Sequence, residues 1–85
     1  MKSMKTNPSQ EYIGLKMSSQ APIPVNLRQG KQNVIHVTGV EVTKANATGR
    51  RLTCVFQLNG QEIMTRRVYL EHVERMMDKF GVDLP

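Results

Sequence analysis

Apolar and polar residues alternate most clearly in RLTCVFQL, residues 51–58. Leu52, Cys54, Phe56 and Leu58 occupy every second position of this run. Strict alternation over such a length is typical of a β-strand with one buried face. We therefore predict a strand over about 51–58 with these four side chains turned inward.

The segment before it, NVIHVTGVEVT, is rich in β-branched residues, which favour strands. Ile35 and Val37 occupy odd positions before Gly39, whereas Val40 and Val42 occupy even positions after it. A β-bulge at this glycine would restore a single inward face. We predict a strand over about 33–43 with that bulge.

Asn59 and Gly60 predict a tight turn, because a type I′ turn needs positive φ at both central residues and this pair adopts it readily. A third strand over about 61–67 then follows directly, with Leu58 opposite Gln61. Continued along the ladder, this register sets Phe56 opposite Ile63. A three-residue loop with a bulge would instead shift the third strand by one residue and exchange its two faces.

The hairpin brings two pairs of arginines to its open end. In the direct register, Arg51 and Arg66 share one face, while Arg67 lies on the other face beside Leu52. Lys44, just before the preceding turn, adds a further cation. We call these residues the predicted basic cluster: Lys44, Arg50, Arg51, Arg66 and Arg67.

The same register predicts an apolar strip on the second face of the sheet, made of Val55, Met64 and Val68. Exposed apolar strips tend to mark interfaces. We therefore expect this strip to support a homodimer or another protein contact.

The last segment, YLEHVERMMDKF, spaces Leu70, Val73, Met76, Met77 and Phe80 three and four residues apart. This spacing predicts an amphipathic helix over about 69–80, with Gly81 as the residue that ends it. Residues 32–85 are thus expected to form a single small α+β domain, a three-stranded antiparallel sheet with one C-terminal helix on one face. Residues 1–31 are expected to be a basic arm or linker, with one short strand near 12–17 as an option, because Pro22 and Pro24 forbid a helix.

The chain has 85 residues and a formal net charge of +5. A basic chain of this size suits a polyanion or an acidic protein surface, although such a charge also serves solubility alone. Cys54 is the only cysteine, which excludes an intramolecular disulfide and favours a reducing, cytoplasmic location. No stretch approaches the roughly 18 apolar residues of a membrane span, so no membrane association is expected.

Catalytic and metal-binding patterns are missing from the sequence. Cys54, His36 and His72 stand apart without metal-ligand spacing, and no phosphate-binding glycine loop occurs. Cys54 on an inward face is better explained as a small buried residue than as a nucleophile. We expect no enzymatic activity, no cofactor and no small-molecule substrate.

The functional hypothesis is based on the predicted basic cluster. Arginine presents a fixed fork of donors that suits phosphate, and four aromatic residues are too few for a typical base-stacking reader. We predict a non-enzymatic nucleic-acid-binding module that contacts the phosphate backbone, preferably of a duplex. Two alternatives stay open: a homodimeric protein-interaction module, acting as an accessory subunit or inhibitor, and a solvated basic sheet end without a site.

Overall fold

The computed structural model of the chain describes residues 8–27 and 33–83. These residues form a five-stranded sheet in the order β4-β3-β2-β1-β5, in which every neighbouring pair is antiparallel. The elements are the 3₁₀ helix η1 (Pro8–Tyr12), β1 (Lys16–Asn26), β2 (Val34–Ala45), β3 (Arg51–Leu58), β4 (Gln61–Tyr69), α1 (Leu70–Met77) and β5 (Gly81–Asp83).

The fold class is confirmed as α+β, with a C-terminal helix packed on an antiparallel sheet. The predicted number of strands was wrong, because the described residues form five strands and not three. One additional strand, β1, comes from the segment that we expected to be an arm. The other, β5, follows the helix. The parts of the expected arm at 1–7 and 28–31 lie outside the described residues.

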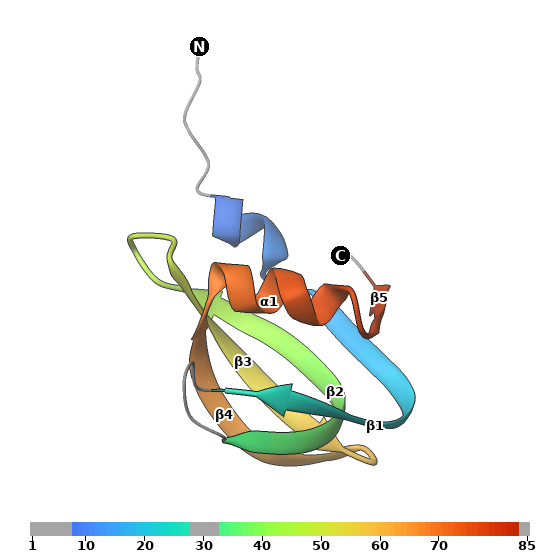
Figure 1. Cartoon of the computed structure of the whole chain (residues 1–85). Coiled ribbons are helices and arrows are strands. Elements are labelled where there is room, and N and C mark those ends of the chain that lie inside the picture. Colours follow the sequence, from blue (N-terminus) through green and yellow to red (C-terminus); the bar gives the residue numbers. More distant parts are fainter. Residues whose placement is uncertain (1–7, 28–32, 84–85) are drawn as a thin grey trace.

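β1 belongs to the sheet because both of its ends supply buried residues. Met17 at one end and Val25 at the other are almost inaccessible to solvent. Between them the pairing with β2 is interrupted. Ser18 pairs with Gly39 and Ile23 pairs with Val37, so β1 advances by five residues while β2 advances by two. The predicted bulge of β2 at Gly39 is wrong, because the extra residues opposite this part of β2 belong to β1, and the bulge that β2 makes against β3 is at Thr43. The bend lets β1 curl around the sheet, from β5 at one end to the front of the view in Figure 1.

The helix α1 lies over the hollow side of this curl (Figure 1). It begins at Leu70, close to the predicted start, but it ends at Met77 rather than near residue 80. The amide groups of Lys79 and Phe80 both donate to the carbonyl oxygen of Met76, which tightens the chain into a turn. Gly81 then pairs with Ser18 as the first residue of β5.

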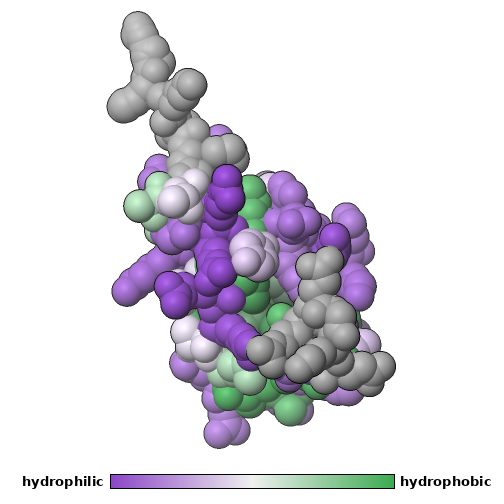
Figure 2. Space-filling model, turned by 60° about the vertical axis from the view of Figure 1, so that its left-hand side comes forward, coloured by the Kyte–Doolittle hydropathy of each residue, from purple (hydrophilic) through white to green (hydrophobic). Residues whose placement is uncertain are grey.

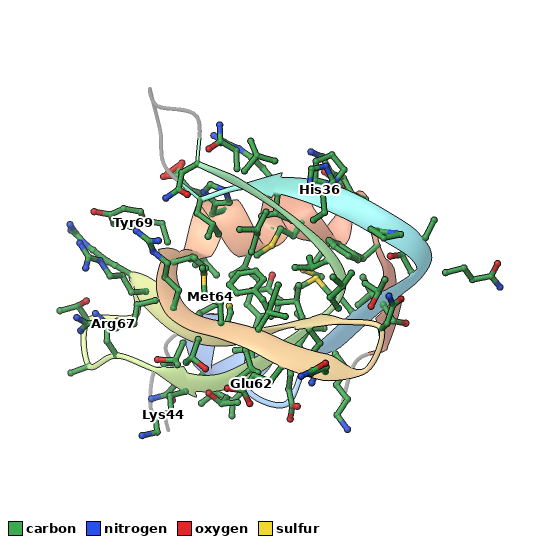
Figure 3. All side chains as sticks on the ribbon, turned by 90° about the horizontal axis from the view of Figure 1, so that it is seen from below. His36, Lys44, Glu62, Met64, Arg67 and Tyr69 are labelled. Atoms are coloured by element: carbon green, nitrogen blue, oxygen red, sulfur yellow. The ribbon has the colours of Figure 1, made fainter. Side chains whose placement is uncertain are left out.

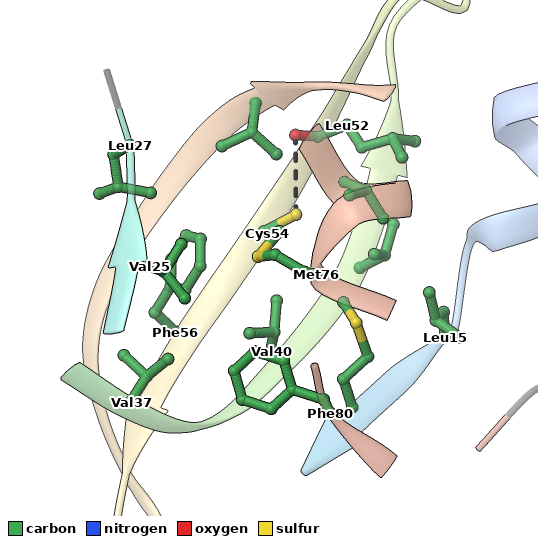
Figure 4. Packing of buried hydrophobic residues seen from close by; sticks show 14 residues of the cluster. Leu15, Val25, Leu27, Val37, Val40, Leu52, Cys54, Phe56, Met76 and Phe80 are labelled. Carbon is green, nitrogen blue, oxygen red and sulfur yellow. Dashed lines mark hydrogen bonds between the residues drawn. The ribbon is translucent and has the colours of Figure 1, made fainter. Parts of the chain in front are cut away.

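The core fills the space between the curled sheet and α1 (Figure 4). Leu52, Cys54 and Phe56 are completely buried, as the alternation in 51–58 predicts. α1 adds Val73 and Met76 from its inner side. The core cluster consists of Leu15, Met17, Val25, Leu27, Val37, Val40, Val42, Leu52, Cys54, Phe56, Val68, Val73, Met76 and Phe80.

The 3₁₀ helix η1 is tied to α1 by a hydrogen bond. The hydroxyl group of Tyr12 donates to Oε2 of Glu74 at 3.3 Å. Burial raises the pKa of Tyr12, and the neighbouring Glu74 carboxylate raises it further. The interaction therefore joins a segment near the chain start to the last helix.

The thiol of Cys54 lies in the middle of this core. Its side chain is completely inaccessible, and its closest polar partner is the carbonyl oxygen of Leu52 at 3.9 Å. Burial raises the pKa of Cys54 to about 12. Since the thiolate is the reactive form, the native thiol is chemically inert at neutral pH.

We predict that Cys54 of the native protein reacts with a disulfide reagent such as DTNB at least ~10³-fold more slowly at pH 8 than in the denatured chain. Reaction requires opening of the core, so the rate should rise with urea as the protein unfolds. Absorbance of the released thiolate measures it. Equal rates for native and denatured protein would contradict this burial.

The β3–β4 hairpin turns at Asn59 and Gly60, whose φ angles are 53° and 84°. The predicted two-residue turn with positive φ at both positions is confirmed. The amide group of Asn59 also donates to Oγ1 of Thr38 at 2.7 Å, which fastens the turn to β2.

The register beyond the turn differs from the prediction. Leu58 pairs with Gln61, and Gln57 pairs with Glu62, but Phe56 then pairs with Met64. Ile63 is the bulged residue, and it is 45% exposed. The predicted pairing of Phe56 with Ile63 is therefore wrong.

The physical reason for the bulge lies at the other end of the hairpin. The direct register would turn Arg67 inward beside Leu52, where a charged side chain carries a large desolvation cost. With the bulge, Val68 pairs with Leu52 and is buried in the core. The bulge thus exchanges an arginine for a valine at a buried position.

We predict that Gly60→Ala lowers the free energy of unfolding by about 1 kcal/mol, because an alanine at φ 84° is strained even though no atom lies within 4 Å of the added Cβ. Asn59→Gly serves as the control and should change it by less than about 0.5 kcal/mol. Urea denaturation measures both. A Gly60→Ala variant as stable as the wild type would contradict the turn geometry.

Candidate functional site

The bulge at Ile63 decides which face of β4 each arginine occupies. Arg67 pairs with Thr53, and Tyr69 pairs with Arg51, so these residues share the outer face of the sheet. Arg66 pairs with Cys54 and lies half-buried on the inner face. The expected grouping, with Arg51 and Arg66 on one face and Arg67 on the other, is therefore reversed.

The predicted apolar strip is not present for the same reason. Val68 is 5% exposed and belongs to the core, opposite Leu52. Met64 packs against the core from the same inner face, whereas Val55 is on the outer face. The three residues Val55, Met64 and Val68 therefore form no continuous exposed surface.

Three cations remain together on the outer face, and we call Lys44, Arg51 and Arg67 the outer basic cluster. Lys44 on β2 and Arg67 on β4 flank Thr53 of β3 in one row across the sheet. Two strand spacings separate them, which is roughly 10 Å. Arg51 lies two residues before Thr53, in the next row of the same face. Arg50 adjoins the cluster in the β2–β3 turn.

Figures 2 and 3 show this side of the molecule. Lys44, Arg67 and Tyr69 all lie on the left in Figure 3, away from the core. Figure 2 turns the side with the β2–β3 turn and β4 towards the reader and shows a band of strongly hydrophilic residues down its middle.

The β2–β3 turn fixes the backbone of two arginines. Oδ1 of Asn46 accepts the amide groups of Arg50 at 3.0 Å and Arg51 at 3.1 Å. The carbonyl oxygen of Arg50 accepts the amide of Leu70, the first residue of α1, at 2.9 Å. One amide side chain therefore holds the start of β3, which in turn anchors the start of the helix.

Arg51 and Tyr69 form a defined pair. A guanidinium nitrogen of Arg51 donates to the hydroxyl oxygen of Tyr69 at 3.0 Å, and its central carbon lies 4.8 Å from the ring centroid. Tyr69 is 51% exposed. An arginine that is hydrogen-bonded and held over an aromatic ring loses little further freedom when it binds an anion.

Sequence reasoning missed Tyr69, which we treated as the start of the helix. Tyr69 pairs with Arg51 because the bulge at Ile63 shifts β4 by one residue. The sequence could have indicated this shift, because a face made of Met64, Arg66 and Val68 ends on an apolar residue. Only this alternation puts an apolar residue at the buried end of β4.

In the part of the chain that the structure describes, no acid forms an ion pair with the outer basic cluster, although Glu41 lies in the next row of the same face, opposite Val55. Within residues 8–27 and 33–83, the ion pair found joins Arg75 to Glu71 on α1, at 3.8 Å. Lys44 and Arg67 have no carboxylate within ion-pair distance in that part of the chain, so neither Glu41 nor an acidic helix residue pairs with them. The positive potential of this face is therefore available to an external anion.

Other kinds of site were sought in the same residues. No group of three His, Cys, Asp or Glu side chains that could hold a metal ion occurs in the described ranges. Of the helices described there, none is long and apolar enough to cross a membrane.

The chain was also compared with known proteins. No protein-family model, no curated protein and no solved structure matches it.

We predict that Asn46→Ala lowers the free energy of unfolding by about 1 kcal/mol, because two amide donors, one of them partly buried, lose their acceptor. Thr48→Ala in the same turn is the control and should cost less than about 0.5 kcal/mol, since Thr48 is exposed. Urea denaturation compares the two variants. If Asn46→Ala were no more destabilising than the control, Asn46 would not hold the turn.

Proposed function

We propose that this protein is a small, non-enzymatic nucleic-acid-binding module that contacts the phosphate backbone through the outer basic cluster. The observation that carries the proposal is the gathering of three cations in neighbouring rows of one sheet face without a carboxylate partner among the described residues. Such a surface attracts a polyanion over a distance of about the Debye length, ~8–10 Å at physiological salt.

The side-chain types of this face also suit phosphate. Arg51 and Arg67 offer planar forks of donors, and Lys44 offers a compact charge on a flexible stem. The hydroxyl-bearing Thr53 lies between Lys44 and Arg67 in the same row. Hydroxyl and cationic donors of this kind make most of the backbone contacts in protein–nucleic acid complexes.

An acidic protein surface is the alternative partner for the same cations. The variant of that idea in which Val55, Met64 and Val68 form a homodimer interface is not favoured, because the fold places Val68 in the core. We place the proposed function in the cytoplasm, where nucleic acid is accessible and a lone thiol such as Cys54 stays reduced.

We predict that affinity for nucleic acid falls steeply with salt and that Arg67→Gln reduces the slope of log K against log [salt] by about 0.7–0.9, the value for one lost phosphate contact. The neighbouring Arg66→Gln is a matched control, because it removes the same charge from the opposite face of β4. Its slope should change by less than about half as much. Fluorescence anisotropy over a range of salt concentrations measures both.

Two outcomes would count against this proposal. Equal slope changes for Arg66→Gln and Arg67→Gln would mean that the outer face is not the contact surface. Absence of binding to any oligonucleotide at low salt would exclude the nucleic-acid function and leave the acidic protein surface as the candidate partner.

A further inference from the structure

A groove of about 420 Å³ lies next to the outer basic cluster, between the C-terminal half of β1 and α1. Its size falls within the range of sites for small organic molecules. Val25, Leu27 and Met76 contribute buried apolar surface to it, and Tyr69 stands at its edge with half of its surface exposed. The groove therefore offers an apolar lining for a flat ring.

The polar residues of the groove include two cations, Arg75 and Lys79. His72, Arg75 and Lys79 follow one another at spacings of three and four residues, which places them on one side of α1 and the turn after it. Glu71 is the one carboxylate among the residues that line the groove. Its exposed ion pair with Arg75, at 3.8 Å, offsets the charge of that arginine, so Lys79 supplies the net positive charge of the groove.

Tyr69 connects the groove with the outer basic cluster. It lines the groove, and on the outer face it pairs with Arg51, whose guanidinium lies over its ring. Tyr69 is also the last residue of β4, two residues after Arg67. An extended ligand can therefore touch the cations of the sheet and the groove at the same time.

We propose that the ligand is a single-stranded nucleic acid, with its phosphates on the outer basic cluster and one unpaired base in the groove against Tyr69. This inference rests on the proposed function and names its substrate class. Single-strand binding sites combine a cationic path for the backbone with aromatic rings for bases. A base of an intact duplex is paired and stacked, so it cannot enter the groove without an unpairing cost of a few kcal/mol.

The proposal corrects the expected preference for a duplex. That expectation followed from the small number of aromatic residues, which excludes a long series of stacked bases. One exposed ring beside a groove is enough for one base, and the remaining affinity comes from backbone contacts.

The test uses fluorescence anisotropy with a labelled DNA oligonucleotide of mixed sequence, the RNA of the same sequence, and the DNA annealed to its complement. The 85-residue chain should bind one of the single strands at least ~10-fold more tightly than the duplex. Comparison of the DNA with the RNA shows which sugar is preferred.

Substitutions on β4 test whether the unpaired base stacks on Tyr69. Tyr69→Ala should weaken single-strand binding by roughly 5- to 100-fold, the range for loss of one stacked base. Duplex binding should weaken several-fold less, because a duplex loses only the contact that orients Arg51. Tyr69→Phe keeps the ring and should restore most of the affinity. Ile63→Ala removes another exposed apolar side chain from β4 and should have no effect.

A photochemical cross-link keeps the test independent of the folding of Tyr69→Ala. A single strand that contains 5-iodouracil is irradiated with the wild-type protein, and mass spectrometry should find the cross-link at Tyr69 or His72. Equal affinity for single strand and duplex, with Tyr69→Ala unchanged, would overturn the single-strand inference while the phosphate-binding function stands. Failure of all three oligonucleotides to bind would overturn both.

Discussion

The burial of Val68 against Leu52 is the contact on which the arrangement of the site depends. β4 reaches that pairing because Ile63 is bulged out near the turn, which shifts every following residue by one position. A shift by one exchanges the two faces of a strand. The same apolar contact that completes the core therefore decides that Arg67 and Tyr69 face outward and that Arg66 faces inward.

The other elements of the fold cover core residues that a three-stranded sheet alone would leave exposed to solvent. β1 bends around the sheet and supplies buried residues at both ends, and β5 extends the sheet beyond it. The helix covers the hollow side, and its first amide group bonds to the carbonyl oxygen of Arg50. Because Asn46 holds the amides of Arg50 and Arg51, the turn that positions the cations also positions the helix.

The sequence was sufficient for the local elements but not for the pairings between them. The alternation in 51–58, the Asn59-Gly60 turn and the helix start depend on short-range preferences, and all three are confirmed. β1 was missed because Pro22 and Pro24 lower strand propensity, while its place in the sheet depends on distant partners in β2 and β5. The bulge was missed because Ile63 and Met64 are both apolar, so either one fits the inward position opposite Phe56. The closeness of the cations could be predicted, but the face of each one could not.

The grouping of cations in the outer basic cluster does not stabilise the isolated fold. Like charges in neighbouring positions of a sheet repel one another, so Arg51 and Arg67, which are diagonal neighbours on one face, oppose folding in the absence of an anion. Lys44 lies two strand spacings from Arg67 and adds less repulsion. Arg51 is also held in one geometry by Tyr69, and fixing a long side chain costs conformational entropy. Both costs are offset when a phosphate lies between the cations, because the repulsion is then screened and the arginine is already oriented. A surface that is unfavourable alone and favourable with an anion is the pattern expected of a binding site, which is the physical argument for the proposed phosphate contacts.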